Sequence, residues 1–167
     1  MGVFQCDDID LAVVRELIDD INNHYQISEQ ALLMLEQQPD DAELVLSLFR
    51  SVHTIKGDLS IVGFSPALPL MNAVEHLLSL LREGKIHYSP LISDLVLLVL
   101  DRVRGLVDSF KANGFVEYDQ QQVQQLGDMM TTIAADISRG GVQSGQEAKM
   151  AEVIRLLDPS VDIDDHL

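Results

Sequence analysis

The stretch "FRSVHTIKGDLSIVGF", residues 49–64, decides the fold because it reads as one amphipathic helix with an unusual outer face. At about 100° per residue, His53, Lys56 and Gly57 fall together on the side opposite the apolar positions. A glycine in a helix interior costs about 1 kcal/mol relative to alanine. A solvated surface histidine needs no glycine beside it, so the pattern indicates a reactive side chain that another protein approaches closely. The predicted core stripe comprises Leu44, Leu48, Val52, Ile55, Leu59 and Val62.

Helix signals recur on both sides of this stretch, with almost no strand pattern. Asp40, followed by Glu43 three positions later, is expected to cap the helix that carries His53, and Gly63 to end it. The dipeptides Ser65-Pro66 and Ser89-Pro90 are start signals for two later helices, because proline is tolerated at the first helical position. The predicted helices cover roughly residues 11–37 (with a bend near 22–28), 40–62, 65–84, 89–113 and 119–139.

These helices predict an all-α protein, an antiparallel bundle with a four-helix core and about five helices in all. The later part of the first helix and the four helices after it would form the bundle, as a domain of residues 1–140. Residues 141–167 are expected to add a flexible linker within "GGVQSGQE", an extra C-terminal helix over "EAKMAEVIRLL" and a frayed acidic end, "VDIDDHL".

Composition excludes several classes of partner. Hydrophobic residues make up 47% of the chain, aromatic residues 5%, and tryptophan is absent, so aliphatic side chains must build the interior. The formal net charge is −16, from 27 acidic and 11 basic side chains. Nucleic acid and anionic membranes would repel such a surface, and we expect neither as a partner.

The compartment is expected to be the cytoplasm. Cys6 is the single cysteine, which rules out an internal disulfide and indicates reducing surroundings. The start, "MGVFQCDDID", lacks the basic and then apolar order of a signal peptide. The most apolar run, "LISDLVLLVL", is too short to span a bilayer.

"HTIKG" followed by Gly63 matches the pattern H-x-x-K-G-x-x-x-x-x-G of histidine phosphotransfer (HPt) domains. From about residue 10 to 140 the chain resembles this family, and it is most similar to the N-terminal phosphotransfer domain of the chemotaxis kinase CheA. The resemblance implies a helical bundle whose surface histidine accepts a phosphoryl group from a kinase or a receiver aspartate. The group is then passed to a receiver domain of a two-component phosphorelay.

By this resemblance, His53 is the phosphoryl acceptor, Lys56 is the lysine of the pattern and Gly57 is the accommodating glycine. Glu75, in "NAVEHLL", matches a glutamate that hydrogen-bonds the imidazole in CheA-like domains. A carboxylate at Nδ1 would fix the tautomer and leave the lone pair of Nε2 free for attack. Lys56 would offset negative charge on the phosphoryl oxygens.

Two positions depart from the CheA-like pattern. Asn72 stands where a further histidine of the network would fall, and Asp58 stands where small residues are common. These departures leave the tuning of the histidine's reactivity open.

A docking surface is expected around the histidine. Leu46, Phe49 and Ser60 share its helix face with Gly57, and exposed apolar side chains beside a reactive group favour a partner site. The expected partners are a histidine kinase catalytic domain and receiver domains of response regulators.

No nucleotide-binding motif is present in the sequence, so we expect a phosphoryl carrier without an ATP site of its own, not an enzyme. It would carry covalent phosphate on His53, with no intrinsic cofactor and with magnesium supplied by the partner. The remaining histidines lack the lysine-glycine context, and we expect no metal site; they are His24, His76, His87 and His166.

Three alternatives remain at this point. The chain could be the N-terminal fragment of a longer CheA-like kinase. It could instead be a module that docks receiver domains without transfer, although pure docking requires no nucleophile. A purely structural bundle would leave Gly57 unexplained.

Overall fold

Six helices and two short strands make up the computed structural model, which describes residues 1–5, 11–139 and 143–157. Their order in the chain is β1 (Gly2–Gln5), α1 (Leu11–Gln37), α2 (Ala42–Ile61), α3 (Leu68–Arg82), α4 (Pro90–Asn113), β2 (Phe115–Tyr118), α5 (Gln120–Ser138) and α6 (Gln143–Leu157).

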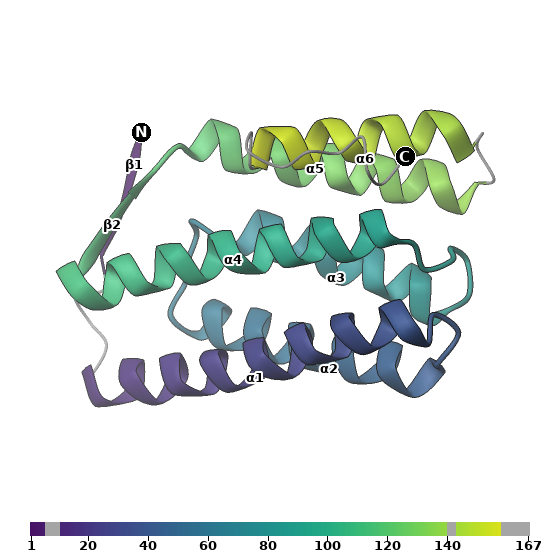
Figure 1. Ribbon diagram of the computed structural model, residues 1–167. Coiled ribbons are helices and arrows are strands. Elements are labelled where there is room, and N and C mark those ends of the chain that lie inside the picture. The colour runs from purple at the N-terminus through teal and green to yellow at the C-terminus, as the bar shows by residue number, and fades with distance from the viewer. Residues whose placement is uncertain (6–10, 140–142, 158–167) are drawn as a thin grey trace.

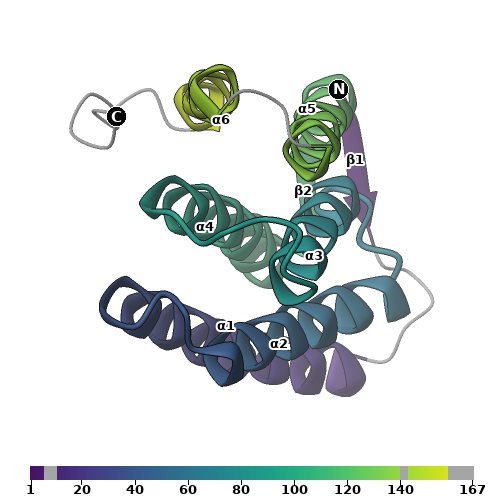
Figure 2. The same cartoon turned by 90° about the vertical axis from the view of Figure 1, so that its right-hand side faces the viewer.

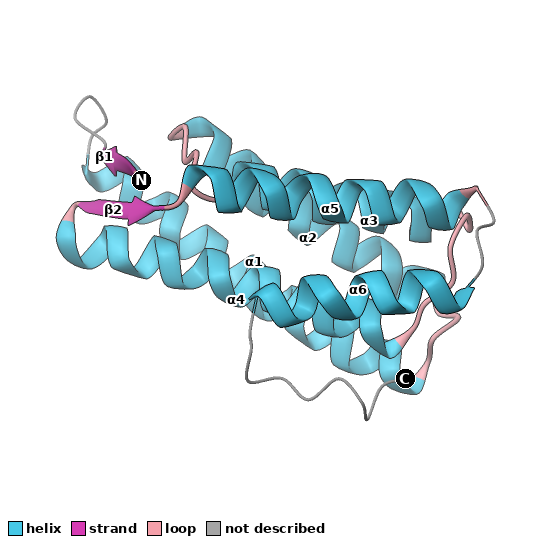
Figure 3. Cartoon of the chain, turned by 90° about the horizontal axis from the view of Figure 1, so that it is seen from above, coloured by secondary structure: helices cyan, strands magenta, loops and turns pink. Residues whose placement is uncertain are grey.

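The helices lie in stacked pairs with their long axes roughly aligned (Figures 1 and 2). The first pair is α1 beside α2, the middle pair is α4 beside α3, and the outer pair is α6 beside α5. Seen from above, α5 and α6 lie over the bundle and the two strands pair at one end (Figure 3). The predicted all-α bundle, with a four-helix core and an extra C-terminal helix, is confirmed.

The core between these pairs is aliphatic, as the composition predicts. On α2, Leu48, Val52, Ile55 and Leu59 are each at most 1% exposed. The two ends of the predicted stripe, Leu44 and Val62, are half-buried and pack against the same core. The stripe therefore fixes the rotation of α2 about its own axis, and this rotation decides which side chains face outward.

Along its whole length α1 belongs to the bundle, not only in its later part. It runs without interruption through residues 22–28, where the sequence predicts a bend. Its buried side begins at Val14 and reaches Leu35 without a gap in the helical spacing. The apolar repeat continues beneath the polar "NNH" segment, which explains why that segment does not break the helix.

Both ends of α2 are set by specific groups. Asp41, not Asp40, is the N-cap: its side chain accepts hydrogen bonds from the backbone N–H groups of Glu43 at 3.0 Å and Leu44 at 3.3 Å. Gly63 ends the helix at a φ of +65°, a left-handed conformation that favours glycine. The backbone N–H of Phe64 then donates to the carbonyl oxygen of Leu59 at 2.9 Å.

The start of α3 is three residues later than predicted. Residues 65–67 form a turn, in which the Ser65 hydroxyl bonds the hydroxyl of Tyr118 at 2.8 Å instead of capping the helix. Tyr118 belongs to β2, which pairs antiparallel with β1. The sequence does not predict these strands, because four residues are too short to show an alternating pattern. Their pairing holds Phe4 against Phe64, with 4.8 Å between ring centroids.

The outer pair of helices packs closely on the bundle. At Gly127 of α5, a Cβ atom would come within 2.9 Å of the carbonyl oxygen of Pro69 on α3, so this position has no room for a side chain. The helix α6 starts at Gln143, within the predicted linker. Among its residues 148–157, the buried side chains are Met150, Ala151, Val153 and Ile154.

Part of the predicted C-terminal organisation is not described. Residues 140–142 of the predicted linker and the acidic end at 158–167 lie outside the described residues. The division of the chain at residue 140 therefore stays a prediction. Within the described part, no helix combines the length and the apolar character needed to cross a membrane.

A polar cluster of Asp20, His24, Ser51 and Asp58 lies between α1 and α2. The imidazole of His24 is 3.5 Å from a carboxylate oxygen of Asp20 and 3.4 Å from the Ser51 hydroxyl. Burial, together with the neighbouring carboxyl of Asp20, raises the pKa of Asp58 to about 7. Asp58 thus interacts with Asp20 of α1 across the interface between the two helices.

This raised pKa predicts a stability that falls as the pH rises. Between about pH 4 and about pH 7 the folded chain keeps a proton on Asp58 that the unfolded chain has already released. Asp58→Asn should therefore be more stable than wild type above pH 7, by roughly 1 kcal/mol after solvent screening. Urea unfolding at about pH 5 and about pH 8 measures this, and the gain should be smaller at the lower pH.

The exposed Asp108 of α4 provides the matched control, since Asp108→Asn removes the same charge from an exposed side chain. An equal gain at both pH values, or a loss above pH 7, would contradict the assignment for Asp58.

Candidate functional site

The outer face of α2 carries the residues that the sequence singles out. Its apolar stripe is buried against the core, and His53 lies on the opposite side with 64% of its side chain exposed. Gly57 and Ser60 are exposed one and two turns further along the helix, and Lys56 is half-buried beside them. The predicted orientation of this face is therefore the one observed.

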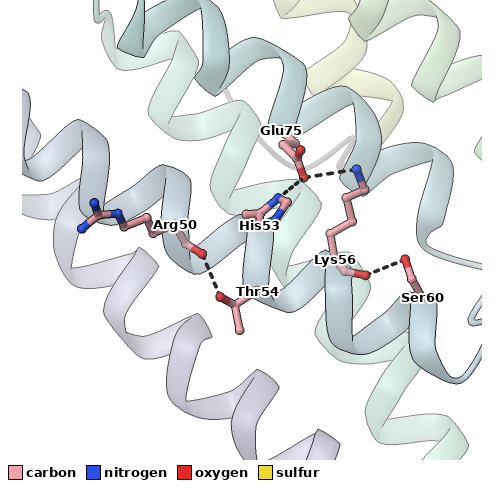
Figure 4. Close-up of polar contacts among 6 residues, drawn as sticks. All are labelled: Arg50, His53, Thr54, Lys56, Ser60 and Glu75. Atoms are coloured by element: carbon pink, nitrogen blue, oxygen red, sulfur yellow. Dashed lines mark hydrogen bonds and ion pairs between the residues drawn. The ribbon is translucent and has the colours of Figure 1, made fainter.

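Glu75 of α3 joins this face from the neighbouring helix (Figure 4). Its Oε2 atom is 3.2 Å from Nδ1 of His53 and 3.3 Å from Nζ of Lys56. One carboxylate oxygen thus holds both side chains, and the carboxylate is well covered, with 19% of the side chain exposed. The three residues named from the sequence for the chemistry meet at one point.

The contact at Nδ1 has a direct chemical consequence. A carboxylate accepts a hydrogen bond from Nδ1–H, which selects the tautomer that carries its lone pair on Nε2. Among the described residues, no hydrogen-bond partner meets Nε2. The ring can therefore act as an exposed nucleophile whose other nitrogen is held by a negative charge.

Gly57 is not required by the fold of this chain. A Cβ atom at this position would meet nothing within 4 Å, and its φ is not positive. The hydroxyl of Ser60 donates to the carbonyl oxygen of Lys56 at 2.8 Å, within the helix (Figure 4). The bare backbone at Gly57 therefore leaves open space beside His53 that no part of the described chain fills.

Leu46 and Phe49, the apolar members of the predicted docking surface, lie in different surroundings. Leu46 lines a shallow groove between α1 and α2, together with His24 and Ile27. Phe49 is half-buried, packs against the core and stacks on the ring of His53. The guanidinium of Arg82, at the end of α3, lies over the Phe49 ring.

Arg82 lies near the site, and the sequence does not indicate its contact with Phe49. The spacing of Phe49 and His53 by one helical turn could have been used to expect their contact. For Arg82 there is no comparable signal, because its approach depends on how α3 crosses α2.

The remaining candidates lie away from His53. Asn72 is exposed one turn before Glu75 and makes no hydrogen bond to the imidazole. His76 and His87 are exposed, whereas His24 bonds α1 to α2. Cys6 and His166 lie outside the described residues. In the part of the chain that the structure describes, no three His, Cys, Asp or Glu side chains cluster as metal ligands.

The chain is similar to known proteins in both sequence and fold. The model of the Hpt domain family matches residues 12–136. The chain is 27% identical over 135 residues to the chemotaxis protein CheA of Bacillus subtilis, a match that covers 81% of this chain and 19% of that protein. It is 34% identical over 96 residues to CheA of Halobacterium salinarum, covering 58% of this chain and 14% of the relative. The chain thus spans less than a fifth of the length of either relative.

A solved structure has the same fold. The phosphorylated P1 domain of CheA3, in complex with CheY6 from R. sphaeroides, superposes with a TM-score of 0.57 at 24% identity, covering 90% of this chain and 98% of that one. The bundle, the outward histidine and the match over most of the helical region lead to one conclusion: this chain belongs to the Hpt domain family.

Proposed function

We propose that this chain is a histidine phosphotransfer module that takes a phosphoryl group on Nε2 of His53 and delivers it to a receiver aspartate. The observation that carries the proposal is the 3.2 Å contact between Nδ1 of His53 and Oε2 of Glu75 on a side chain that is 64% exposed. This contact combines a fixed tautomer with an open nucleophilic nitrogen.

The bonds made and broken in the transfer step are accounted for by the donor and the ring alone. The Nε2 lone pair attacks phosphorus and forms the N–P bond, while the P–O bond to the donor breaks. The donor leaves as ADP if it is ATP held by a kinase, or as a carboxylate if it is an aspartyl phosphate. Nδ1 keeps its proton, and the positive charge that develops on the ring is stabilised by Glu75.

Lys56 contributes the local positive charge. Its ammonium group, 3.3 Å from Oε2 of Glu75, stands one helical turn from His53. We propose that it offsets the charge of the phosphoryl oxygens once the group is on the ring, and that it holds the Glu75 carboxylate before transfer. Both roles are electrostatic and involve no proton transfer.

The proposed partners are receiver domains and a histidine kinase catalytic domain. The P1 domain of CheA3 forms a complex with CheY6, and we propose that this chain likewise docks receiver domains on the face that carries Gly57, Ser60, Leu46 and Phe49. A histidine kinase catalytic domain would supply the phosphoryl group. Hpt domains are phosphoryl carriers, and we propose that this one has no ATP site, needs no cofactor and works in the cytoplasm with magnesium bound by its partner.

Two other functions remain compatible with the family. The relatives are much longer than this chain, so it can be the phosphotransfer domain of a CheA-like kinase. The length of the native reading frame distinguishes such a domain from a free-standing carrier. A receiver-docking module without transfer is the second. It differs from the proposal in one measurable respect, because it never carries phosphate on histidine.

The first experiment asks whether His53 accepts phosphate. Purified chain is incubated with radiolabelled phosphoramidate and then with receiver domains, including CheY6. We expect phosphate that is acid-labile and base-stable on the wild-type chain and that leaves it when a receiver is added. His53→Gln should lose this label yet keep its circular dichroism spectrum and melting temperature, because the side chain lies outside the core.

His76→Gln is the matched control, since His76 is an exposed histidine one residue after Glu75. It should accept phosphate at the wild-type rate. Equal labelling of the His53→Gln variant would show that another residue is the acceptor, and labelling without release to any receiver would exclude a carrier.

The second experiment separates the roles of Glu75 and Lys56. Glu75→Gln should slow phosphate acceptance roughly tenfold, a typical effect of losing a carboxylate that orients a histidine. It should also lower the fraction of the Nδ1–H tautomer, which ¹⁵N NMR of the neutral ring reports. Lys56→Ala should slow acceptance while changing the tautomer fraction less, because it does not touch the ring. A wild-type tautomer fraction in Glu75→Gln would contradict the orienting role.

The third experiment concerns Gly57. Gly57→Ala and Gly57→Arg should both raise the free energy of unfolding, by up to about 1 kcal/mol, since both residues favour a helix over glycine and a Cβ meets nothing there. Gly57→Arg should slow transfer to a receiver, whereas Gly57→Ala should change it much less. Wild-type transfer in the arginine variant would remove the steric explanation for this glycine.

A further inference from the structure

A row of three side chains leads from α3 to the reactive ring. Phe49, one turn before His53 on α2, stacks on the imidazole with 6.1 Å between ring centroids and 11° between their planes. The guanidinium carbon of Arg82 lies 4.1 Å from the centroid of the Phe49 ring. We call Arg82, Phe49 and His53 the Arg82 stack.

A hydrogen bond at one nitrogen does not by itself fix an imidazole. Glu75 holds His53 at Nδ1, and most of the side chain is exposed, so few other atoms restrain it. The terminal torsion of a histidine side chain is broad, and the ring can turn while the hydrogen bond is kept. Such a turn would swing Nε2 away from the line of an incoming phosphorus atom.

A nearly parallel aromatic ring restrains this rotation, because tilting the imidazole would reduce the contact between the two faces. Phe49 is itself held from two sides. It packs against the core, and the cation of Arg82 is attracted to the face of its ring. Glu75 and Arg82 both belong to α3. This helix therefore restrains the imidazole directly, through the Glu75 contact at Nδ1, and indirectly, through Phe49, which limits tilting of the ring plane.

We propose that Phe49 and Arg82 are positioning residues for phosphotransfer, and that the Arg82 stack keeps the imidazole plane oriented with Nε2 toward the donor. This proposal rests on the proposed function of His53. The predicted docking surface gives Phe49 the role of contacting a docked partner. The present proposal gives it a different role, which is to position the imidazole.

Phosphoramidate is the probe that separates these two roles, since a donor of this size has no surface to dock. Nε2 forms a bond to phosphorus, the P–N bond of phosphoramidate breaks, and ammonia leaves. A residue that acts only by contacting a receiver should not affect the rate of this reaction. A residue that positions the ring should affect it.

Four variants of the full chain test the stack. Phe49→Leu removes the ring and keeps the charge of Arg82, whereas Arg82→Gln removes the charge and keeps the ring. We expect both to slow labelling of His53 by phosphoramidate, by roughly two- to fivefold, as is typical for loss of one exposed cation–π or stacking contact. Phe49→Tyr and Arg82→Lys retain a ring and a cation, respectively, and should recover most of the wild-type rate.

The second measurement is the NMR spectrum of the His53 ring in the same variants. The ring protons of a stacked imidazole are shifted by the current of the neighbouring aromatic ring. Phe49→Leu should abolish that shift, Arg82→Gln should reduce it, and the conservative variants should keep it. Thermal unfolding of each variant identifies any loss of rate caused by unfolding. Arg82→Gln should leave the core intact, because the Arg82 side chain is exposed.

Arg155→Gln on α6 is the control for charge, because it removes one cation from the outer pair of helices. It should leave both the rate and the ring shifts unchanged. If Arg82→Gln slowed labelling but Phe49→Leu did not, Arg82 would act by attracting the anionic donor, and the stack would be excluded as the cause. Wild-type rates in both variants, with or without changed ring shifts, would also overturn the proposal.

Failure of the proposed function has a different signature. It would appear as a wild-type chain that never passes phosphate to a receiver, whatever the ring shifts show. Conversely, a wild-type chain that transfers phosphate, with variants that behave like it towards phosphoramidate, would leave the proposed function standing and remove only the role of the stack.

Discussion

The rotation of α2 about its own axis is the constraint on which the site depends. Four aliphatic side chains at helical spacing are almost completely buried, from Leu48 to Leu59, and turning the helix would expose them. Each such side chain contributes about 1.5–3 kcal/mol when buried. The position of His53 on the outer face is therefore a consequence of core packing, and no separate interaction is needed to direct the histidine outward.

The second element is α3, which converts an exposed histidine into an organised one. Glu75 reaches both His53 and Lys56 with a single oxygen atom, and Arg82 contacts Phe49 two turns later. These contacts require α3 to lie at a defined height along α2. The close approach of Gly127 to Pro69 fixes α5 against the other side of α3, so the outer pair of helices supports the helix that carries Glu75.

Positive side chains lie near His53 although the chain as a whole is strongly acidic. The chain as a whole carries a formal net charge of −16, yet Lys56 stands one helical turn from His53, and Arg82 lies over the neighbouring Phe49 ring. In the proposed function, a phosphoryl group on His53 would meet the positive charge of Lys56 against this acidic background.

The sequence by itself determined the helical class, the buried stripe of α2 and the outward face with His53, Lys56 and Gly57, because helical periodicity is a local property. It also indicated Glu75, through a motif rather than through physics. Tertiary structure alone decided the contacts that join distant segments. The strands β1 and β2 are too short to leave a pattern, and the Ser65 hydroxyl bonds Tyr118 instead of capping a helix. Arg82 reaches Phe49 only because α3 packs at one height on α2, and the height at which two helices pack is set by the fit of many side chains at once, which no local spacing encodes.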